Sequence, residues 1–374
     1  MQPMARAIKQ IAGDSLLVGK LPMGCRLCAK GSKMVLFVTG LCDSTCYYCP
    51  LSIEKAGKDV TFADEIPVLS DSDVVSELDA IGAKGSGFSG GDPLCRVERT
   101  LHYLKLLKSV PTPAFHIHLY TSKCNVDKAT LKKLRNAGLD EIRFHPQTDD
   151  WTGVENAVAT GINVGLEVPA IPGTADWLQA LAMRAEEIGV SFMNINELEA
   201  SESNFQRIAA LGMRLGSMDA SSVAGSRETA KEVMEWGTQN LSKLSLHYCS
   251  ARFKDAIQMR NRLERRLKRT RRPFEERDDS DPLLILGVVR APHGQRLDMP
   301  ALSSIQDALR SYFDVPSRLM NVDTKRMRIE IAPWVLTEIA GELRRTVKQG
   351  FEIEVGIVHE YPTWDRLQTL FSPL

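Results

Sequence analysis

Short apolar runs alternate with segments of helical period over most of the first 250 residues. Runs typical of strands lie at 33–40, 85–91, 115–122, 140–146, 164–173, 190–199 and 244–250. Segments in which apolar residues recur at helical spacing stand between them, at 70–83, 96–110, 127–138, 152–161, 175–189 and 226–240. Right-handed crossovers place each new strand beside the last, so this order predicts an α/β fold with a parallel sheet wound into a partial barrel of the (βα)6 type.

Three cysteines, Cys42, Cys46 and Cys49, fall within eight residues directly after the first predicted strand. Loops at the carboxyl ends of barrel strands gather at one mouth, where active sites lie. A Cys-x3-Cys-x2-Cys loop supplies thiolates for three irons of a [4Fe-4S] cluster and leaves the fourth iron open to a ligand from solution. A zinc site or a group of unliganded thiols is the plainer alternative.

Cysteine usage and hydropathy indicate the compartment. The chain has 374 residues, eight cysteines and equal numbers of acidic and basic side chains. No apolar run approaches the roughly 20 residues that span a bilayer, and the first residues lack the apolar core of a signal peptide. We therefore expect a cytoplasmic protein without a membrane partner, in which cysteines bind metal rather than form disulfides.

The cysteine loop, with Tyr48 directly before its last cysteine, resembles the signature of the radical S-adenosylmethionine (SAM) superfamily. The residues around this loop are most similar to those of pyruvate formate-lyase activating enzymes and their archaeal-type relatives. The resemblance to the superfamily covers Ser32 to Asn196. It implies an oxidoreductase or transferase that reduces its cluster by one electron and cleaves SAM to methionine and a 5′-deoxyadenosyl radical, which abstracts hydrogen from a substrate. It also implies a low-potential electron donor of the ferredoxin or flavodoxin type.

The stretch "GFSGGDPL" at 87–94 resembles the GGE motif of the same family, whose backbone binds the amino group of SAM. Gly90 and Gly91 permit close approach of the main chain, and Asp92 stands where glutamate is usual. Polar residues at later strand ends are further candidates for SAM binding, each with a structural hydrogen-bonding role as the alternative. The full candidate set for the cofactor is Tyr48, Gly90, Gly91, Asp92, Arg143, His145, Glu167 and Asn194, with Asn196 and Glu197 nearby.

A second metal site is predicted from three other cysteines. Cys25 and Cys28 form a Cys-x2-Cys pair, a spacing that suits zinc or a second iron-sulfur cluster. Cys249 ends the last predicted strand, two residues after His247, and a partly closed barrel would bring that strand near the first. The alternative is a reduced thiol pair and a small buried Cys249.

The segment 251–272 is strongly basic. It carries ten Lys or Arg residues against Asp255 and Glu264, a net charge of +8. One interpretation is a phosphate-binding surface for tRNA, to which arginine suits bidentate contacts. The other is a solvated helix that pairs with the acidic residues just beyond it.

We predict four parts: an N-terminal CxxC metal-binding segment at 1–32, the radical SAM partial barrel at 33–250, a basic helix and linker at 251–281, and a small C-terminal α/β accessory domain at 282–374. Three tasks fit them. The first is modification of RNA, most plausibly tRNA. The second is activation of a protein or turnover of a small metabolite. The third, of another class, is a non-catalytic iron-sulfur protein that binds RNA or acts as a scaffold.

Overall fold

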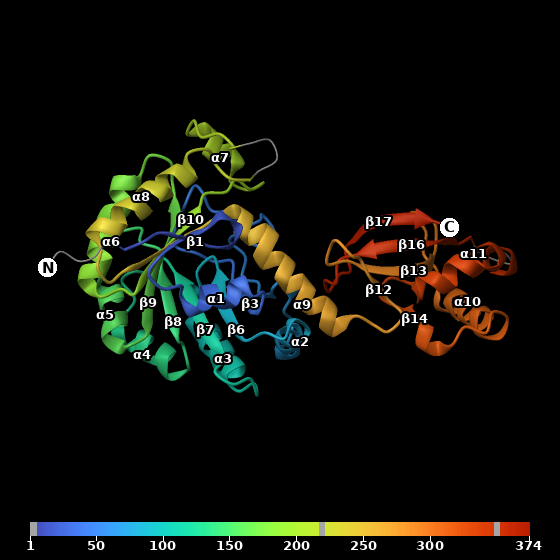
Figure 1. Cartoon of the computed structure of the whole chain (residues 1–374). Coiled ribbons are helices and arrows are strands. Elements are labelled where there is room, and N and C mark those ends of the chain that lie inside the picture. Colours follow the sequence, from blue (N-terminus) through green and yellow to red (C-terminus); the bar gives the residue numbers. More distant parts are fainter. Residues whose placement is uncertain (1–5, 217–220, 348–351) are drawn as a thin grey trace. The chain divides into compact units, whose positions relative to one another are not determined.

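The computed structural model describes residues 6–216, 221–347 and 352–374. The chain divides into two compact units, the first ending at Arg262 and the second beginning at Leu263, a boundary inside helix α9 (Arg260–Thr270). Each unit has its own sheet (Figure 1). Within these ranges, no helix combines the length and the apolar character needed to cross a membrane.

The first unit is built on parallel strands with helices between them (Figure 1). The parallel strands are β3 (Lys33–Thr39), β6 (Gly85–Gly90), β7 (His116–Thr121), β8 (Glu141–Phe144), β9 (Asn163–Ala170), β10 (Phe192–Glu197) and β11 (Ser245–Cys249), in the sheet order β11-β10-β9-β8-β7-β6-β3. The helices between them are α2 (Asp71–Ile81), α3 (Val97–Lys108), α4 (Lys128–Asn136), α5 (Thr152–Thr160), α6 (Ala175–Ile188), α7 (Phe205–Ala210) and α8 (Ser226–Asn240). This arrangement confirms the predicted partial barrel.

Short antiparallel strands extend the sheet at both edges. β1 (Lys9–Gln10) and β2 (Leu16–Val18) lie outside β11, and β4 (Phe62–Ala63) and β5 (Ile66–Pro67) lie outside β3. Strands of two or three residues carry too little alternation to be recognised, which is why the sequence did not predict them. The sheet therefore ends at β1 and β5 and stays open.

The barrel strands alternate apolar residues outside with polar residues inside. Outward side chains such as Leu36, Leu119 and Leu166 pack into one core under the helices. Residues of the opposite parity line an internal cavity: Lys33, Tyr120, Arg143, Glu167, Asn194 and His247. Layers of branched apolar side chains usually fill such a barrel, so a polar interior favours a chamber that holds a ligand.

Helix α1 (Met23–Ala29) packs against β3, β6 and β7. Its last residues lead directly into the first residue of β3, so α1 lies at the amino ends of the strands, away from the cysteine loop. A Cβ on Gly24 would lie 2.6 Å from Arg143 Nη2 and 2.7 Å from His118 Nδ1, so only glycine allows this approach. Cys25 and Cys28 are both buried on this helix.

The second unit is built on an antiparallel sheet. Its strands are β14 (Met320–Asp323), β15 (Arg328–Ile331), β13 (Leu284–Arg290), β16 (Glu354–Glu360) and β17 (Gln368–Pro373), in that order, with β12 (Glu276–Arg277) paired to β13. Helices α10 (Met299–Ser311) and α11 (Pro333–Val347) contribute to its apolar core. The mixed α/β content agrees with the predicted accessory domain.

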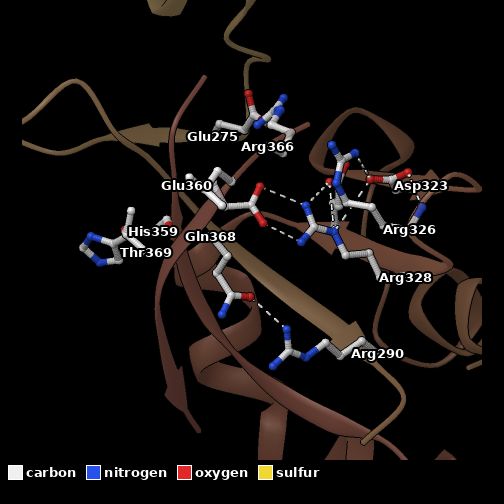
Figure 2. Close-up of polar contacts among 12 residues, drawn as sticks. Glu275, Arg290, Asp323, Arg326, Arg328, His359, Glu360, Arg366, Gln368 and Thr369 are labelled. Atoms are coloured by element: carbon white, nitrogen blue, oxygen red, sulfur yellow. Dashed lines mark hydrogen bonds and ion pairs between the residues drawn. The ribbon is translucent and has the colours of Figure 1, made fainter. Parts of the chain in front are cut away.

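A buried ionic cluster lies in this second unit (Figure 2). Arg328 donates through both terminal nitrogens to Glu360 and through Nη2 to Glu330, and all three residues are buried. Glu275, which the sequence placed in a linker, is buried here and pairs with Arg272 and Arg366. The boundaries that the sequence predicts for the four parts of the chain stay a prediction.

Candidate active site

The three loop cysteines lie at one cavity at the carboxyl end of β3. Cys42, Cys46 and Cys49 line a volume of about 610 Å³, together with Gly90 and Gly91. We call it the mouth cavity. All three thiols are free, Cys42 exposed and the other two half-buried, so the donor set fits three corners of a [4Fe-4S] cluster. No three His, Cys, Asp or Glu side chains of the described residues already converge in metal-binding geometry, and the ligand assignment stays a prediction.

Tyr48 fixes the cysteine loop to the end of β8. Its hydroxyl lies 2.8 Å from His145 Nε2, and His145 Nδ1 lies 2.8 Å from the carbonyl oxygen of Glu167. A carbonyl only accepts, so the hydrogen sits on Nδ1 and the Tyr48 hydroxyl donates to Nε2. Burial lowers the pKa of His145 and keeps the ring neutral. Asn204 adds a 2.9 Å hydrogen bond to the Tyr48 carbonyl.

Gly90 and Gly91 pack directly under the start of the cysteine loop. A Cβ on Gly90 would lie 2.2 Å from the Thr39 carbonyl oxygen, and the φ of +149° also favours glycine. A Cβ on Gly91 would lie 2.4 Å from the Leu41 carbonyl oxygen. The amides of Gly91 and Asp92 donate to these same two carbonyls, at 2.8 and 2.7 Å. The double glycine therefore sets the position of the residue before Cys42.

The Asp92 carboxylate is used inside the protein. It accepts from the Leu94 amide at the start of a 3-10 turn, from the Thr121 hydroxyl, and from the amide and hydroxyl of Ser122. Asp92 is fully buried and is not among the residues that line the mouth cavity. Its side chain thus ties the glycine turn to the end of β7. The contact of Asp92 with SAM stays a prediction.

A second cavity of about 520 Å³ occupies the barrel interior, and we call it the lumen cavity. The two cavities meet, because Tyr48, Cys49, Gly90, Tyr120 and His145 line both. The remaining predicted residues line the lumen cavity alone: Arg143, Glu167, Asn194, Asn196, Glu197, His247, Cys25, Cys28 and Cys249. Their predicted roles toward SAM or a second metal stay predictions.

Arg143 is the centre of the polar network in this lumen. Its guanidinium donates to Glu141 at 2.7 Å and to Glu167 at 3.0 Å. Glu167 also accepts from Asn194 and Asn196, both at 2.8 Å. Burial raises the pKa of Glu167, but Arg143 and these amides outweigh it and hold the pKa below its usual value. The carboxylate is therefore ionised, and both of its oxygens already accept hydrogen bonds.

Cys25 lies within the same network. Arg143 Nη2 and Asn194 Nδ2 donate to its Sγ, at 3.5 and 3.3 Å. Burial alone would raise the pKa of Cys25, but the charge of Arg143 and a hydrogen bond with His247 lower it to about 7. Burial raises the pKa of Cys28 and of Cys249 instead. The three lumen thiols thus differ in charge at neutral pH.

Lys33 and Tyr120 are among the lumen residues that sequence reasoning missed. A signal for Tyr120 was present, since polar residues alternate with apolar ones in its predicted strand, as in His116-x-His118-x-Tyr120. Read with period two, that alternation marks one strand face as polar. Strand ends alone do not indicate the side chains that lie deeper in the barrel.

The basic segment 251–272 forms a π-helical stretch (Phe253–Met259) followed by α9. Several of its charges have acidic partners in the protein. Lys254 pairs with Glu199, and Arg262 pairs with Asp64. Arg272 pairs with Glu275, an acidic residue just beyond the segment. Binding of tRNA by this segment stays a prediction.

Two family models match the sequence. "Radical SAM superfamily" covers residues 36–195, and "Domain of unknown function (DUF8061)" covers residues 283–374. The "Putative glycyl-radical enzyme activating enzyme MJ0021" of Methanocaldococcus jannaschii is 35% identical over 369 residues, which cover 95% of this chain and 93% of that protein. "PqqA peptide cyclase" of Bradyrhizobium diazoefficiens is 30% identical over 128 residues, 34% of this chain and 30% of that protein.

Among solved structures, HydG, a maturase of the [FeFe]-hydrogenase, is similar with a TM-score of 0.39 and 17% sequence identity. The match covers 57% of this chain and 52% of HydG, so the chain spans about half the length of that structure.

Proposed function

The chain belongs to the radical SAM superfamily and is an enzyme, and from this membership we propose that Cys42, Cys46 and Cys49 hold a [4Fe-4S] cluster with SAM beside it in the mouth cavity. The observation that carries the proposal is that the three thiols and the Gly90–Gly91 edge line one volume. Held there by these residues, the cluster and SAM would supply the radical chemistry for hydrogen abstraction from a substrate.

The residues of the chain position these groups. Gly90 and Gly91 present a backbone edge without Cβ atoms, which suits close approach of SAM. Asp92 holds that edge against β7, and the Tyr48–His145 hydrogen bond holds the loop that carries Cys46 and Cys49. Of the polar strand-end residues, His145 is our first candidate for a direct SAM contact, because it lines both cavities.

The lumen cavity is the proposed place of the substrate. It meets the mouth cavity at Cys49 and Gly90, which brings a lumen-bound molecule close to the site of radical formation. The name of the Methanocaldococcus jannaschii relative favours a second candidate, the activation of a protein substrate. For that task a peptide segment would enter the same lumen.

An RNA substrate rests on the charge of segment 251–272 alone. For the test we choose two of the exposed basic residues of this segment, Lys268 and Arg271. Binding of tRNA at low salt, with a salt slope that Lys268→Ala/Arg271→Ala flattens by about one to two units, would support it. A wild-type protein that does not bind tRNA at low salt removes this substrate.

A second metal is the alternative use of Cys25, Cys28 and Cys249. All three line the lumen cavity, which supports it, while the positive charge of Arg143 beside Cys25 Sγ opposes a cation there. A triple serine variant decides between the two uses. Loss of zinc or iron beyond that of the loop cluster supports a second site, and unchanged metal content leaves three thiols.

We further propose a cytoplasmic location and a low-potential donor of the ferredoxin or flavodoxin type. The test of the core proposal is electron paramagnetic resonance of the reconstituted, reduced protein. SAM should change the g-values of the cluster, because it binds the open iron. Spectra that are the same with and without saturating SAM contradict the proposal. Cys124→Ala, a buried cysteine outside both cavities, is the matched control for cysteine substitution.

A further inference from the structure

Lys33 places a buried positive charge in the lumen cavity. It is the first residue of β3, only 8% of it is exposed, and it lines the cavity. Throughout residues 6–216, 221–347 and 352–374, no carboxylate lies within ion-pair distance of Lys33 Nζ, which lies 6.0 Å from the centroid of the Tyr120 ring. An ammonium removed from water without a counterion is unstable, so such a group calls for an anion.

The other charges of the lumen cavity are already matched. Arg143 is neutralised by Glu141 and Glu167 at 2.6 and 3.0 Å, and Lys254 pairs with Glu199. The remaining carboxylate of the cavity, Glu197, accepts from the Ala251 amide and makes no ion pair with Lys33.

The thiols near Lys33 do not replace a carboxylate partner. The Cys25 sulfur already accepts hydrogen bonds from another cation, Arg143, and from Asn194. Burial raises the pKa of the Tyr120 hydroxyl to about 12 and lowers the pKa of His118, so both are neutral. His247 donates to Asn194.

The cavity limits the shape of a ligand that reaches this charge. β3 has seven residues and rises about 3.3 Å per residue, so Lys33 lies about 20 Å along the strand from its end at the cysteine loop. Lys33 and Cys49 nevertheless line one cavity of about 520 Å³, a size typical of small-molecule sites. A folded macromolecule cannot reach its inner end.

We propose that Lys33 is the anion-binding end of the substrate site, and that the substrate is an elongated small molecule whose carboxylate or phosphate pairs with Lys33 Nζ while its reacting carbon lies near Cys49. The inference rests on the proposed function, since it uses the lumen cavity as the substrate site. It adds the chemical class of the substrate and the residue that selects it.

Binding of three probes of equal chain length tests the proposal: hexanoate, hexyl phosphate and hexanol. Isothermal titration is done on anaerobically reconstituted protein saturated with SAM, so that the carboxylate of SAM is not the group measured. One or both anions should bind at least about tenfold more tightly than hexanol, and the tighter anion identifies carboxylate or phosphate. Lys33→Met should abolish this preference, and Lys33→Arg should keep it.

Lys84→Met is the matched control, because Lys84 is exposed and directly precedes β6, at the same end of the barrel as Lys33. It should bind the anions as the wild type does. Equal binding of hexanol and both anions by the wild type, or an anion preference that survives Lys33→Met, overturns the proposal.

A labelling measurement on the wild type covers the case in which Lys33→Met does not fold. The better anion should slow acetylation of Lys33 by acetic anhydride, followed by peptide mass spectrometry, and should leave Lys84 unchanged. Equal acetylation of Lys33 with and without anion overturns the proposal. Cleavage of SAM by the same sample is recorded separately, so failure of the anion site and failure of the proposed function give different results.

Discussion

The Tyr48 hydroxyl donates a 2.8 Å hydrogen bond to Nε2 of His145, and the opposite ring nitrogen donates to the Glu167 carbonyl. One aromatic pair thus connects the loop after β3 with the end of β8 and with the middle of β9. Because Tyr48 precedes Cys49 directly, this chain of hydrogen bonds fixes a proposed cluster ligand to the wall of the barrel.

Tyr48→Phe tests this connection. The variant leaves His145 Nε2 as a buried acceptor without a donor, which costs about 1–3 kcal/mol. We expect urea denaturation of the first unit to shift by that amount and the cluster iron to be lost faster during gel filtration. Tyr47→Phe is the control, because Tyr47 neighbours Tyr48 in the same loop, while the hydrogen bond to His145 comes from Tyr48. Equal iron retention by the two variants would refute the anchoring role.

Gly91→Ala tests the packing of the glycine turn. Its Cβ would lie 2.4 Å from the Leu41 carbonyl oxygen, a backbone atom next to Cys42 that moves only with the loop. We expect the iron content to fall. We also expect the affinity for SAM to fall by at least about tenfold, roughly 1.4 kcal/mol. Gly341→Ala, in a helix where the new Cβ meets no atom within 4 Å, should keep both. Wild-type SAM affinity in Gly91→Ala would contradict the close packing.

The partial barrel was predictable from sequence because its strands and helices are long and strongly periodic. The cysteine loop and Gly90–Gly91 were found because their residue types and spacing mark the chemistry locally. Lys33 was not found, because a single lysine at a strand start has no local signature. Only the parallel register beside β6 and the alternation of faces bring it into the lumen with Arg143.

The second unit shows the same limit. Glu275 lies in a polar stretch typical of a linker, yet Arg366, 91 positions along the chain, pairs with it in the interior. Such a partner cannot be inferred from local composition. The internal hydrogen bonds of Asp92, from Thr121 and Ser122, likewise depend on the neighbouring strand β7.

Cys25 should react as a thiolate near neutral pH. Its pKa of about 7 in the folded protein lies below the usual thiol value of about 8.5. In chelator-treated protein, alkylation by iodoacetamide should therefore rise through pH 7, and in urea its midpoint should return toward the usual value. Peptide mass spectrometry reads each cysteine separately. Cys28 and Cys249, whose pKa values are raised by burial, should react only at more alkaline pH. A midpoint for folded Cys25 at or above that of Cys28 would contradict the assignment.

Arg328→Met should destabilise the second unit. Removing one partner leaves Glu330 and Glu360 buried without their main cation, which costs about 3–5 kcal/mol. Burial raises the pKa of Glu330, but Arg272 and Arg328 outweigh it and lower the pKa below the usual value. The stability from that carboxylate is therefore complete above about pH 4.3 and is lost as pH falls through the lower folded value. Urea denaturation at several pH values, with exposed Arg318→Met as control, should show a smaller acid loss in Arg328→Met.

Formation of 5′-deoxyadenosine from SAM is the most direct measurement of the proposed cluster site. After anaerobic reconstitution and reduction with dithionite, the wild type and Cys124→Ala should form it, detected by liquid chromatography and mass spectrometry. Cys42→Ala, Cys46→Ala and Cys49→Ala should each form none, because a cluster that lacks one of three thiolates is not kept in a form that binds SAM. Formation of 5′-deoxyadenosine by Cys46→Ala at the wild-type rate would show that these thiols do not hold the catalytic cluster.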